Sequence, residues 1–501
     1  MNRRTFLNIG TAATLTAGLG NGVATYAVEK LPEITAGRLP RWRGFNLLEK
    51  FTLDGNKPFV EQDFAWMSKW GFNFARLPLD YRCWAKTPEA KFNESVLREI
   101  DQAVAWGKKF GIHVSLNFHR GPGYCVNDNP KEVSDLWSDQ AIQKQFARHW
   151  GFFAKRYAGL SNREVSFDLI NEPPQITGLK CAAALKPAIE AIKAADAKRL
   201  IIADGLSWGR EPVSELISAG IAQSMHCYDP MEVTHFKASW VPGSDKYSTP
   251  VWPLSKGING YLYGTDKAEF KSPLILQVQC PQALKLVFRV DRVSSSAGLV
   301  VQANGVEVFK HLLKPGPGDG EWKRSTANQW GSYNGEYDRD YTMTVPAGTR
   351  EIRFSVEQGD WLTFSSIRLG DTVIKVASQE WGEKQGVYNV SSKGVKSATG
   401  RYSSSKEILW AQRIKPWLDL QAKGVGVHVG EFGVYNKTPH EVTLAWMRDC
   451  LENFKTAGFG WALWNFRGSF GILDSARADV KYEDYQGHKL DRRMLDLLRK
   501  L

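Results

Sequence analysis

The 501 residues exceed an ordinary single domain and leave room for a barrel of about 250 residues together with a module of roughly 100–130 residues. The net charge of +12 comes without blocks of consecutive basic residues, which favours a solvated surface over nucleic-acid binding and leaves an acidic polysaccharide open as a ligand. The six cysteines lie far apart without a Cys-x-x-Cys pair, which argues against a zinc site or a disulfide framework. A bridge between Cys83 and Cys125, which follow neighbouring predicted strands, stays open.

The N-terminus has the pattern of an export signal. Arg3 and Arg4 precede a weakly apolar run, rich in alanine, glycine and threonine, that ends near Ala27. A twin arginine before such a segment resembles a twin-arginine export signal, and an amphipathic N-terminal helix is the alternative. No later stretch has about 18 uninterrupted apolar residues, so the sequence predicts no membrane span. We therefore expect residues 1–30 to be signal and linker, and the mature protein to be periplasmic or extracellular.

From residue 41 onward, short apolar segments alternate with amphipathic ones. This alternation of strand and helix predicts a parallel sheet covered by helices. The expected strands of this first part are Trp42–Leu48, Phe72–Leu79, His113–Arg120, Val165–Asn171, Arg199–Gly205 and Ala222–Tyr228.

The period changes to strict alternation between about 262 and 385. Several short strands with Gly, Pro and Asp turns, and the hairpin signal Asn304-Gly305, predict a β-sandwich there. Helical periodicity returns over Ser405–Gln421, and the segments Gly424–Glu431 and Phe459–Asn465 complete a set of eight barrel strands. The predicted fold is thus an α/β (β/α)8 TIM barrel, built from residues 31–261 and 386–501. An all-β sandwich domain, residues 262–385, is inserted between its sixth strand and the following helix.

Two of the predicted strands end on a glutamate. Val165–Asn171 is followed by Glu172 and Pro173, and the proline, which has no backbone N–H, ends the strand there. The seventh strand ends at Glu431, between glycines. In a (β/α)8 barrel all carboxyl ends of strands face one mouth, so the two carboxylates should meet there. A retaining glycosidase needs such a pair, with the carboxyl groups about 5–5.5 Å apart.

Other polar and aromatic residues follow the remaining strands at the same mouth. Each alone has a structural interpretation, but together at one rim they are poorly explained by packing, because buried polar groups need partners. These residues are Arg76, His119, Asn171, His226, Tyr228 and Trp464.

Four of these motifs together resemble glycoside hydrolase family 5, of the clan A retaining glycosidases. They are Asn171-Glu172-Pro173, His226-x-Tyr228, Glu431-Phe432-Gly433 and Trp464, and the resemblance covers about 40–245 and 400–501. The inserted β-sandwich lies outside the core of that family.

The resemblance implies a role for each site residue. Glu172 would be the acid/base and Glu431 the nucleophile, with Asn171 on the sugar 2-hydroxyl. Tyr228 and Arg76 would orient Glu431 and keep it ionised. His119 and His226 would line the subsite of the distorted sugar, and Trp464 would be its stacking platform. This chemistry requires no metal and no organic cofactor, and we expect a monomer.

The inserted module has three interpretations: it binds carbohydrate, it caps one end of the cleft, or it only packs. Its aromatic residues are candidate sugar platforms, and a core role is the alternative for each: Trp322, Trp330, Tyr333, Tyr337 and Trp361. Tyr124, in the loop after the third strand, either borders the cleft or packs in a turn.

The sequence thus predicts a secreted, retaining, cellulase-like endo-β-glucanase acting on a β-linked poly- or oligosaccharide. Exo-β-glucosidase, β-1,3-glucanase, xyloglucanase and β-mannanase activities are alternatives on the same machinery, as is transglycosylation. A carbohydrate-binding protein on an inactive barrel is the alternative of another class, and the presence of both glutamates argues against it.

Overall fold

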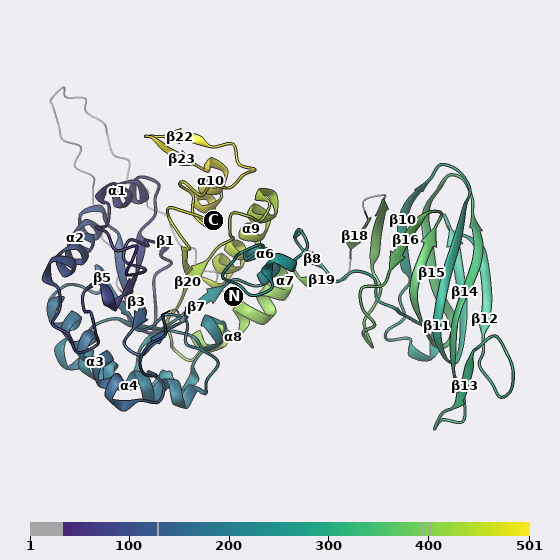
Figure 1. Ribbon diagram of the computed structural model, residues 1–501, viewed down its shortest axis with the longest axis horizontal. Coiled ribbons are helices and arrows are strands. Elements are labelled where there is room, and N and C mark those ends of the chain that lie inside the picture. The colour runs from purple at the N-terminus through teal and green to yellow at the C-terminus, as the bar shows by residue number, and fades with distance from the viewer. Residues whose placement is uncertain (1–33, 128–129, 392–393, 400–401) are drawn as a thin grey trace, which may run out of the picture.

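The computed structural model describes residues 34–127, 130–391, 394–399 and 402–501 and comprises a barrel and a β-rich module (Figure 1). The two are joined by a narrow ribbon of β8 (Leu254–Ser255) and β19 (Tyr402–Ser404), through which the chain leaves the barrel and returns to it. The predicted export signal lies outside the described residues. No helix within the described part of the chain is long and apolar enough to cross a membrane.

Eight parallel strands close the barrel, in the order β2-β1-β21-β20-β7-β6-β5-β3, with β3 pairing back onto β2. This confirms the predicted (β/α)8 TIM barrel. The strands are β1 (Arg43–Asn46), β2 (Phe74–Asp80), β3 (His113–Gly121), β5 (Val165–Asp168), β6 (Ile201–Asp204), β7 (Ala222–Cys227), β20 (Val427–Phe432) and β21 (Gly460–Leu463).

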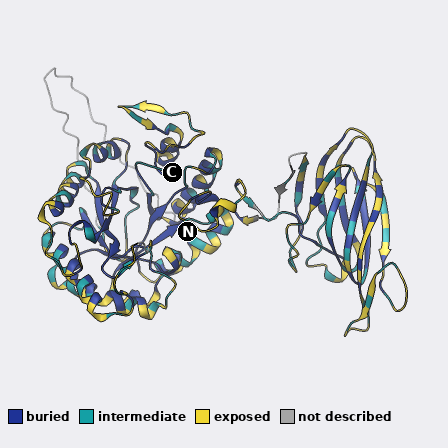
Figure 2. Ribbon diagram, in the orientation of Figure 1, coloured by how far each residue is buried: buried dark blue, intermediate teal, exposed yellow. Residues whose placement is uncertain are grey.

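The helices surround this ring and bury one face against it, as the dark inner and yellow outer faces in Figure 2 show. They are α1 (Glu61–Lys69), α2 (Glu94–Phe110), α3 (Gln140–Arg156), α4 (Gly178–Ala195), α5 (Leu206–Gly209), α6 (Met231–Thr234), α7 (Lys406–Leu409), α8 (Lys415–Gln421), α9 (His440–Ala457) and α10 (Arg492–Lys500). The Asp139 side chain accepts hydrogen bonds from the first turn of α3 and so fixes its start. The short helix predicted near 212–217 is a 3₁₀ helix over Ser214–Ala219.

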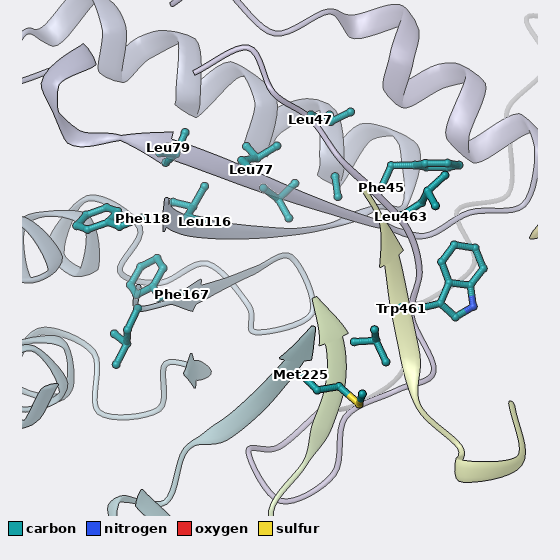
Figure 3. Close-up of a cluster of buried hydrophobic side chains, with 14 of the residues drawn as sticks. Phe45, Leu47, Leu77, Leu79, Leu116, Phe118, Phe167, Met225, Trp461 and Leu463 are labelled. Carbon is teal, nitrogen blue, oxygen red and sulfur yellow. The ribbon is translucent and has the colours of Figure 1, made fainter. Parts of the chain in front are cut away.

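Alternation along the barrel strands separates an apolar outer layer from a polar interior. Phe167 of β5 points outward and packs on Trp150 of α3, with ring centroids 5.2 Å apart. Apolar side chains of several strands form the same outer layer (Figure 3). The next residue, Asp168, points the other way and contacts Arg76 of β2, which is not a neighbouring strand. Because successive side chains of a strand face opposite sides, every second position is free to carry polar chemistry inside the barrel.

The module consists of antiparallel strands with one parallel pair, β10 with β17, folded around a separate hydrophobic core. Its strands are β9 (Tyr261–Tyr263), β10 (Leu274–Cys280), β11 (Leu284–Ala303), β12 (Val306–Leu313), β13 (Arg324–Ala327), β14 (Tyr333–Val345), β15 (Thr349–Leu369), β16 (Thr372–Lys375), β17 (Val387–Ser391) and β18 (Gly394–Thr399). The last two strands follow residue 385 and pair into the same sheet.

Two long strands, β11 and β15, build both layers of this module. The first half of β11 pairs with β14 and its second half with β12, and the register shifts between Ser294 and Ala297. Phe288, from the first half of β11, stacks on Phe354, from the other half of the sheet, with ring centroids 5.2 Å apart. The sequence predicts two short strands within β11, because the bend interrupts the alternation.

Candidate active site

A cleft of about 750 Å³ opens at the carboxyl ends of the barrel strands. Glu172, His226, Glu431 and Trp464 are among its lining residues. The module supplies none of the described residues that line this cleft, so the capping interpretation has no support from its geometry.

Both predicted carboxylates lie at the bottom of this cleft, on either side of His226. Glu172 Oε1 lies 2.9 Å and Glu431 Oε2 3.6 Å from the same imidazole nitrogen, Nδ1. One ligand atom from each of the three residues lies within 4.8 Å of the other two. Among the described residues, this is also the one group whose geometry could hold a metal ion.

Glu431 is held from two directions by hydrogen-bond donors. Arg76 Nη1 donates to Oε1 at 2.5 Å, and the Tyr228 hydroxyl donates to Oε2 at 2.9 Å. Burial raises the pKa of Glu431, while the neighbouring His226 and Arg76 act in the opposite direction. The two cations therefore limit the cost of ionising this buried carboxylate.

The backbone of Glu172 is strained and held at both polar atoms. Its φ of 50° lies in the left-handed region, where a residue with a side chain is uncommon. Its N–H donates to Asp204 Oδ2 at 3.1 Å, and its carbonyl oxygen accepts from the Tyr124 hydroxyl at 2.6 Å. Tyr124 thus contacts the predicted acid/base itself, which neither of its two expected roles anticipated.

Arg76 connects the interior of the barrel. Besides Glu431, its guanidinium pairs with Asp168 at 2.7 Å and Asp204 at 3.2 Å, and it donates to Asn171 Oδ1 at 2.9 Å. Burial alone would lower the pKa of Arg76, but the three carboxylates raise it, so the side chain stays charged. Asn171 Nδ2 is buried without a hydrogen-bond partner, which leaves this donor available to a sugar hydroxyl.

An aromatic wall stands on one side of the carboxylates. Trp464 stacks on His119 with ring centroids 5.6 Å apart, and Phe51 contacts both rings. Burial, with a smaller effect of Arg76, holds the pKa of His119 well below its usual value. His119 is therefore neutral, and both of its buried nitrogens lack a protein partner.

A second set of aromatic side chains stands on the opposite side of the cleft. Trp240, half exposed, packs against Phe470 at a centroid distance of 6.3 Å. Trp208, 43% exposed, follows β6 in a left-handed backbone conformation. Rings on both sides of the carboxylates suit a chain of several sugar units better than a single one.

The sequence analysis brought all eight of its site residues to one mouth, and the structure places all eight there. It missed Asp168, Asp204, Phe51 and Phe470. Asp204 carried a usable signal, because an aspartate ending an apolar strand at the barrel mouth is costly to bury without partners. Phe51 and Phe470 lie in irregular loops, where periodicity gives no direction.

Residues 35–256 match the family model described as Cellulase (glycosyl hydrolase family 5), which ends where the chain leaves the barrel. Endoglucanase C of Acetivibrio thermocellus is 28% identical over 223 residues, 43% of this chain and 64% of the relative. A solved structure described as a glycoside hydrolase is 27% identical, with a TM-score of 0.59 over 92% of this chain and 99% of that one. The barrel belongs to glycoside hydrolase family 5.

Other relatives of this family 5 barrel carry different printed activities. Cellodextrinase A of Ruminococcus flavefaciens is 25% identical over 191 residues, 36% of this chain and 55% of the relative. Glucan 1,3-beta-glucosidase of Blumeria graminis is 29% identical over 116 residues, 23% of this chain and 27% of the relative. Thermotoga maritima Cel5A in complex with cellobiose, 16% identical with a TM-score of 0.51 over 91% of this chain and 96% of that one, shares the fold. The chain spans less than two thirds of the length of each of these curated relatives.

Proposed function

We propose that this protein is a retaining β-glycoside hydrolase that cleaves β-glucosidic bonds in polysaccharides, a cellulase-like endo-β-glucanase. The observation that carries the proposal is the separation of the two carboxylates, with one oxygen of each within 4.8 Å of the other. Retaining enzymes hold their carboxyl groups about 5–5.5 Å apart, whereas inverting enzymes need about 6.5–9.5 Å to admit a water.

In the first step Glu431 attacks the anomeric carbon while Glu172 gives its proton to the departing glycosidic oxygen. Arg76 and Tyr228 hold Glu431 ionised and aimed for this attack. A covalent glycosyl-enzyme results. In the second step Glu172, now a carboxylate, takes a proton from water as the water oxygen attacks the anomeric carbon and releases Glu431.

The sugar at the scissile bond would rest between Asn171, the face of Trp464 and the neutral His119. The free amide N–H of Asn171 would donate to the 2-hydroxyl. Hydrogen bonds to this hydroxyl that strengthen in the transition state supply part of the rate enhancement.

The endo mode and the glucan preference are supported by the relatives named endoglucanase and by the aromatic rings on both sides of the carboxylates. The glucan 1,3-beta-glucosidase relative keeps exo action and a β-1,3 linkage as the second candidate. A β-mannanase, or a carbohydrate-binding protein on the same barrel, would fail the substrate test below.

We also propose that the inserted module binds carbohydrate through an aromatic patch near its junction with the barrel. Trp381, 52% exposed, stands nearly perpendicular to Tyr261, Tyr263 and Trp361, with ring centroids 5.6, 5.4 and 5.9 Å away. Of the platforms expected from sequence, Tyr337 is buried in the module core, whereas Trp330 is 76% exposed. Export by a twin-arginine signal, the division of the chain into barrel, module and signal, and a monomeric state complete the proposal.

The test is the release of reducing sugar from cellulose, mixed β-glucan, β-1,3-glucan, mannan and xylan, with Glu431→Ala beside the wild type. Release from β-1,4-glucans, lost by at least about 10⁴-fold in the variant, is the expected result. The anomeric configuration of the first product, followed by NMR, should match that of the substrate. Inversion, equal activity of the variant, or binding without release from any polymer would each overturn the proposal.

A further inference from the structure

We propose that Asp204, His226 and Glu172 form a buried chain in which Asp204 orients the imidazole so that one proton is shared between His226 Nδ1 and Glu172. The inference rests on the proposed retaining mechanism. It adds Asp204 to that mechanism as a positioning residue, acting on the acid/base through His226 and through the backbone.

The imidazole of His226 lies between carboxylates on both edges, and its side chain is fully buried. Nε2 lies 3.1 Å from Asp204 Oδ2, and Nδ1 lies 2.9 Å from Glu172 Oε1. Each ring nitrogen therefore faces a carboxylate oxygen, and the proton on Nδ1 has Glu172 as its nearest partner.

Asp204 contacts the site through one oxygen, Oδ2. The same atom accepts the Glu172 backbone N–H at 3.1 Å and faces Arg76 Nη2 at 3.2 Å. Burial would raise the pKa of Asp204, but His226 and Arg76 outweigh it and lower the pKa to about 2. Asp204 is thus ionised at every pH at which the protein is folded and active.

An ionised carboxylate at 3.1 Å repels the lone pair of a neutral nitrogen and attracts an N–H. Nε2 therefore carries a hydrogen, which leaves Nδ1 as the nitrogen that gains or loses the second proton. That proton lies on the line to Glu172 Oε1, either on the carboxyl group or on the imidazole.

The proton count closes over one turnover. When the glycosidic bond breaks, its electron pair leaves with the departing oxygen, which takes the proton from Glu172. When water attacks the glycosyl-enzyme, its oxygen bonds to the anomeric carbon and its proton returns to Glu172. The pair of Glu172 and His226 ends with the one proton it began with.

Several other charged or titratable groups face His226 from the surrounding strands. They are Glu431 on β20, Arg76 on β2, His119 on β3, Asp168 on β5 and His428 on β20. Burial lowers the pKa of His226, but Asp204 and Glu431 more than reverse this and hold the pKa well above its usual value. Removing the charge of Asp204 should therefore weaken the hold on the shared proton.

The test compares Asp204→Asn with the matched control Asp168→Asn, using aryl β-cellobiosides of graded leaving-group acidity. Both side chains are buried carboxylates paired with Arg76, but only Asp204 contacts His226 and Glu172. For Asp204→Asn we expect kcat/KM to fall on the order of 10- to 100-fold with phenyl and by less than about 3-fold with 2,4-dinitrophenyl, which needs no protonation. Its basic limb in the kcat/KM profile should move to lower pH by about one unit. Asp168→Asn should lose activity by the same factor on both substrates.

A loss that is uniform across leaving groups in Asp204→Asn, or an equal slope in Asp168→Asn, would overturn the proposal. If Asp204→Asn does not fold, ¹⁵N-histidine NMR of the wild-type chain decides, with the His226 signals assigned by their absence in His226→Gln. Nε2 should stay protonated across pH 5–8, whereas an Nε2 without a hydrogen would contradict the chain. A wild type that cleaves none of the aryl glycosides fails the proposed function instead, so the two failures are distinguishable.

Discussion

The Tyr228 hydroxyl donates a 2.9 Å hydrogen bond to Glu431 Oε2, across 203 residues of sequence. Tyr228 follows β7, and Glu431 lies in β20, which pairs with β7 in parallel. The whole module lies between these strands in the chain, yet it leaves and returns through one narrow ribbon. The insertion therefore does not disturb the pairing that brings the tyrosine to the carboxylate.

Tyr228→Phe should shift the acidic limb of the kcat/KM profile to higher pH. The hydroxyl stabilises the ionised form of Glu431, so its removal raises the pKa of a carboxyl group that burial already raises. The nucleophile must be ionised, so the active form is lost at a higher pH as the solution is acidified. We expect a shift of about one unit and a kcat lower by about 10-fold at neutral pH. An unchanged acidic limb would show that the hydroxyl does not act on Glu431.

Tyr124→Phe should lower kcat without changing KM. The substitution removes only the hydrogen bond to the Glu172 carbonyl oxygen, which helps to hold a backbone in the left-handed region. Losing one such bond is worth about 1 kcal/mol, or roughly a 5-fold loss in kcat. Steady-state kinetics on one β-glucan checks this, with Tyr333→Phe in the module as the control that should match the wild type. A rise in KM at constant kcat would instead place Tyr124 in substrate binding.

The stability of the wild type should fall relative to Asp168→Asn as pH rises from about 4 to about 7. Burial, together with the neighbouring Asp204, raises the pKa of Asp168 to about 7. An unfolded aspartate titrates near 3.9, so between these values the folded state holds a proton that the unfolded chain has released. The contribution of this group is present below about pH 4 and is lost as pH passes through the folded-state pKa.

Urea unfolding of both proteins at several pH values in this window measures the effect. The difference in the free energy of unfolding between wild type and variant is the readout, because all other groups titrate in both. Asp266→Asn, on an exposed turn of the module, should run parallel to the wild type. Parallel curves for Asp168→Asn would mean that Asp168 is ionised throughout.

Trp381→Ala should weaken binding of the chain to insoluble glucan. The change removes the most exposed ring of the module's aromatic patch. The loss of one aromatic contact of about 1 kcal/mol predicts a roughly 5-fold weaker affinity. The measurement is a pull-down isotherm in the Glu431→Ala background, which prevents hydrolysis. Trp330→Ala is the matched control, and a larger loss there would move the binding site to the β13–β14 hairpin.

Much of the site could be predicted because barrel topology converts strand ends into neighbours. Glu172 and Glu431 needed only two apolar runs with a glutamate at the end and the rule that parallel strand ends meet. Asp168 and Asp204 escaped because their partner, Arg76, lies on a strand that is not adjacent to theirs. In the module, the bend near Ser294 hid the length of β11, since a register shift breaks the alternation from which a strand is predicted.

The sequence by itself determined the barrel, its interruption by a β-rich module and the eight residues at the mouth, because hydrophobic periodicity and strand-end position are local properties. Only the tertiary structure decided which carboxylates share Arg76, which atom of His226 faces Glu172, and that Tyr124 holds the backbone of Glu172. These contacts depend on side chains that cross the interior of a closed ring. The partner of each is set by the curvature of the sheet and the stagger of its strands, which the order of residues along one strand does not record.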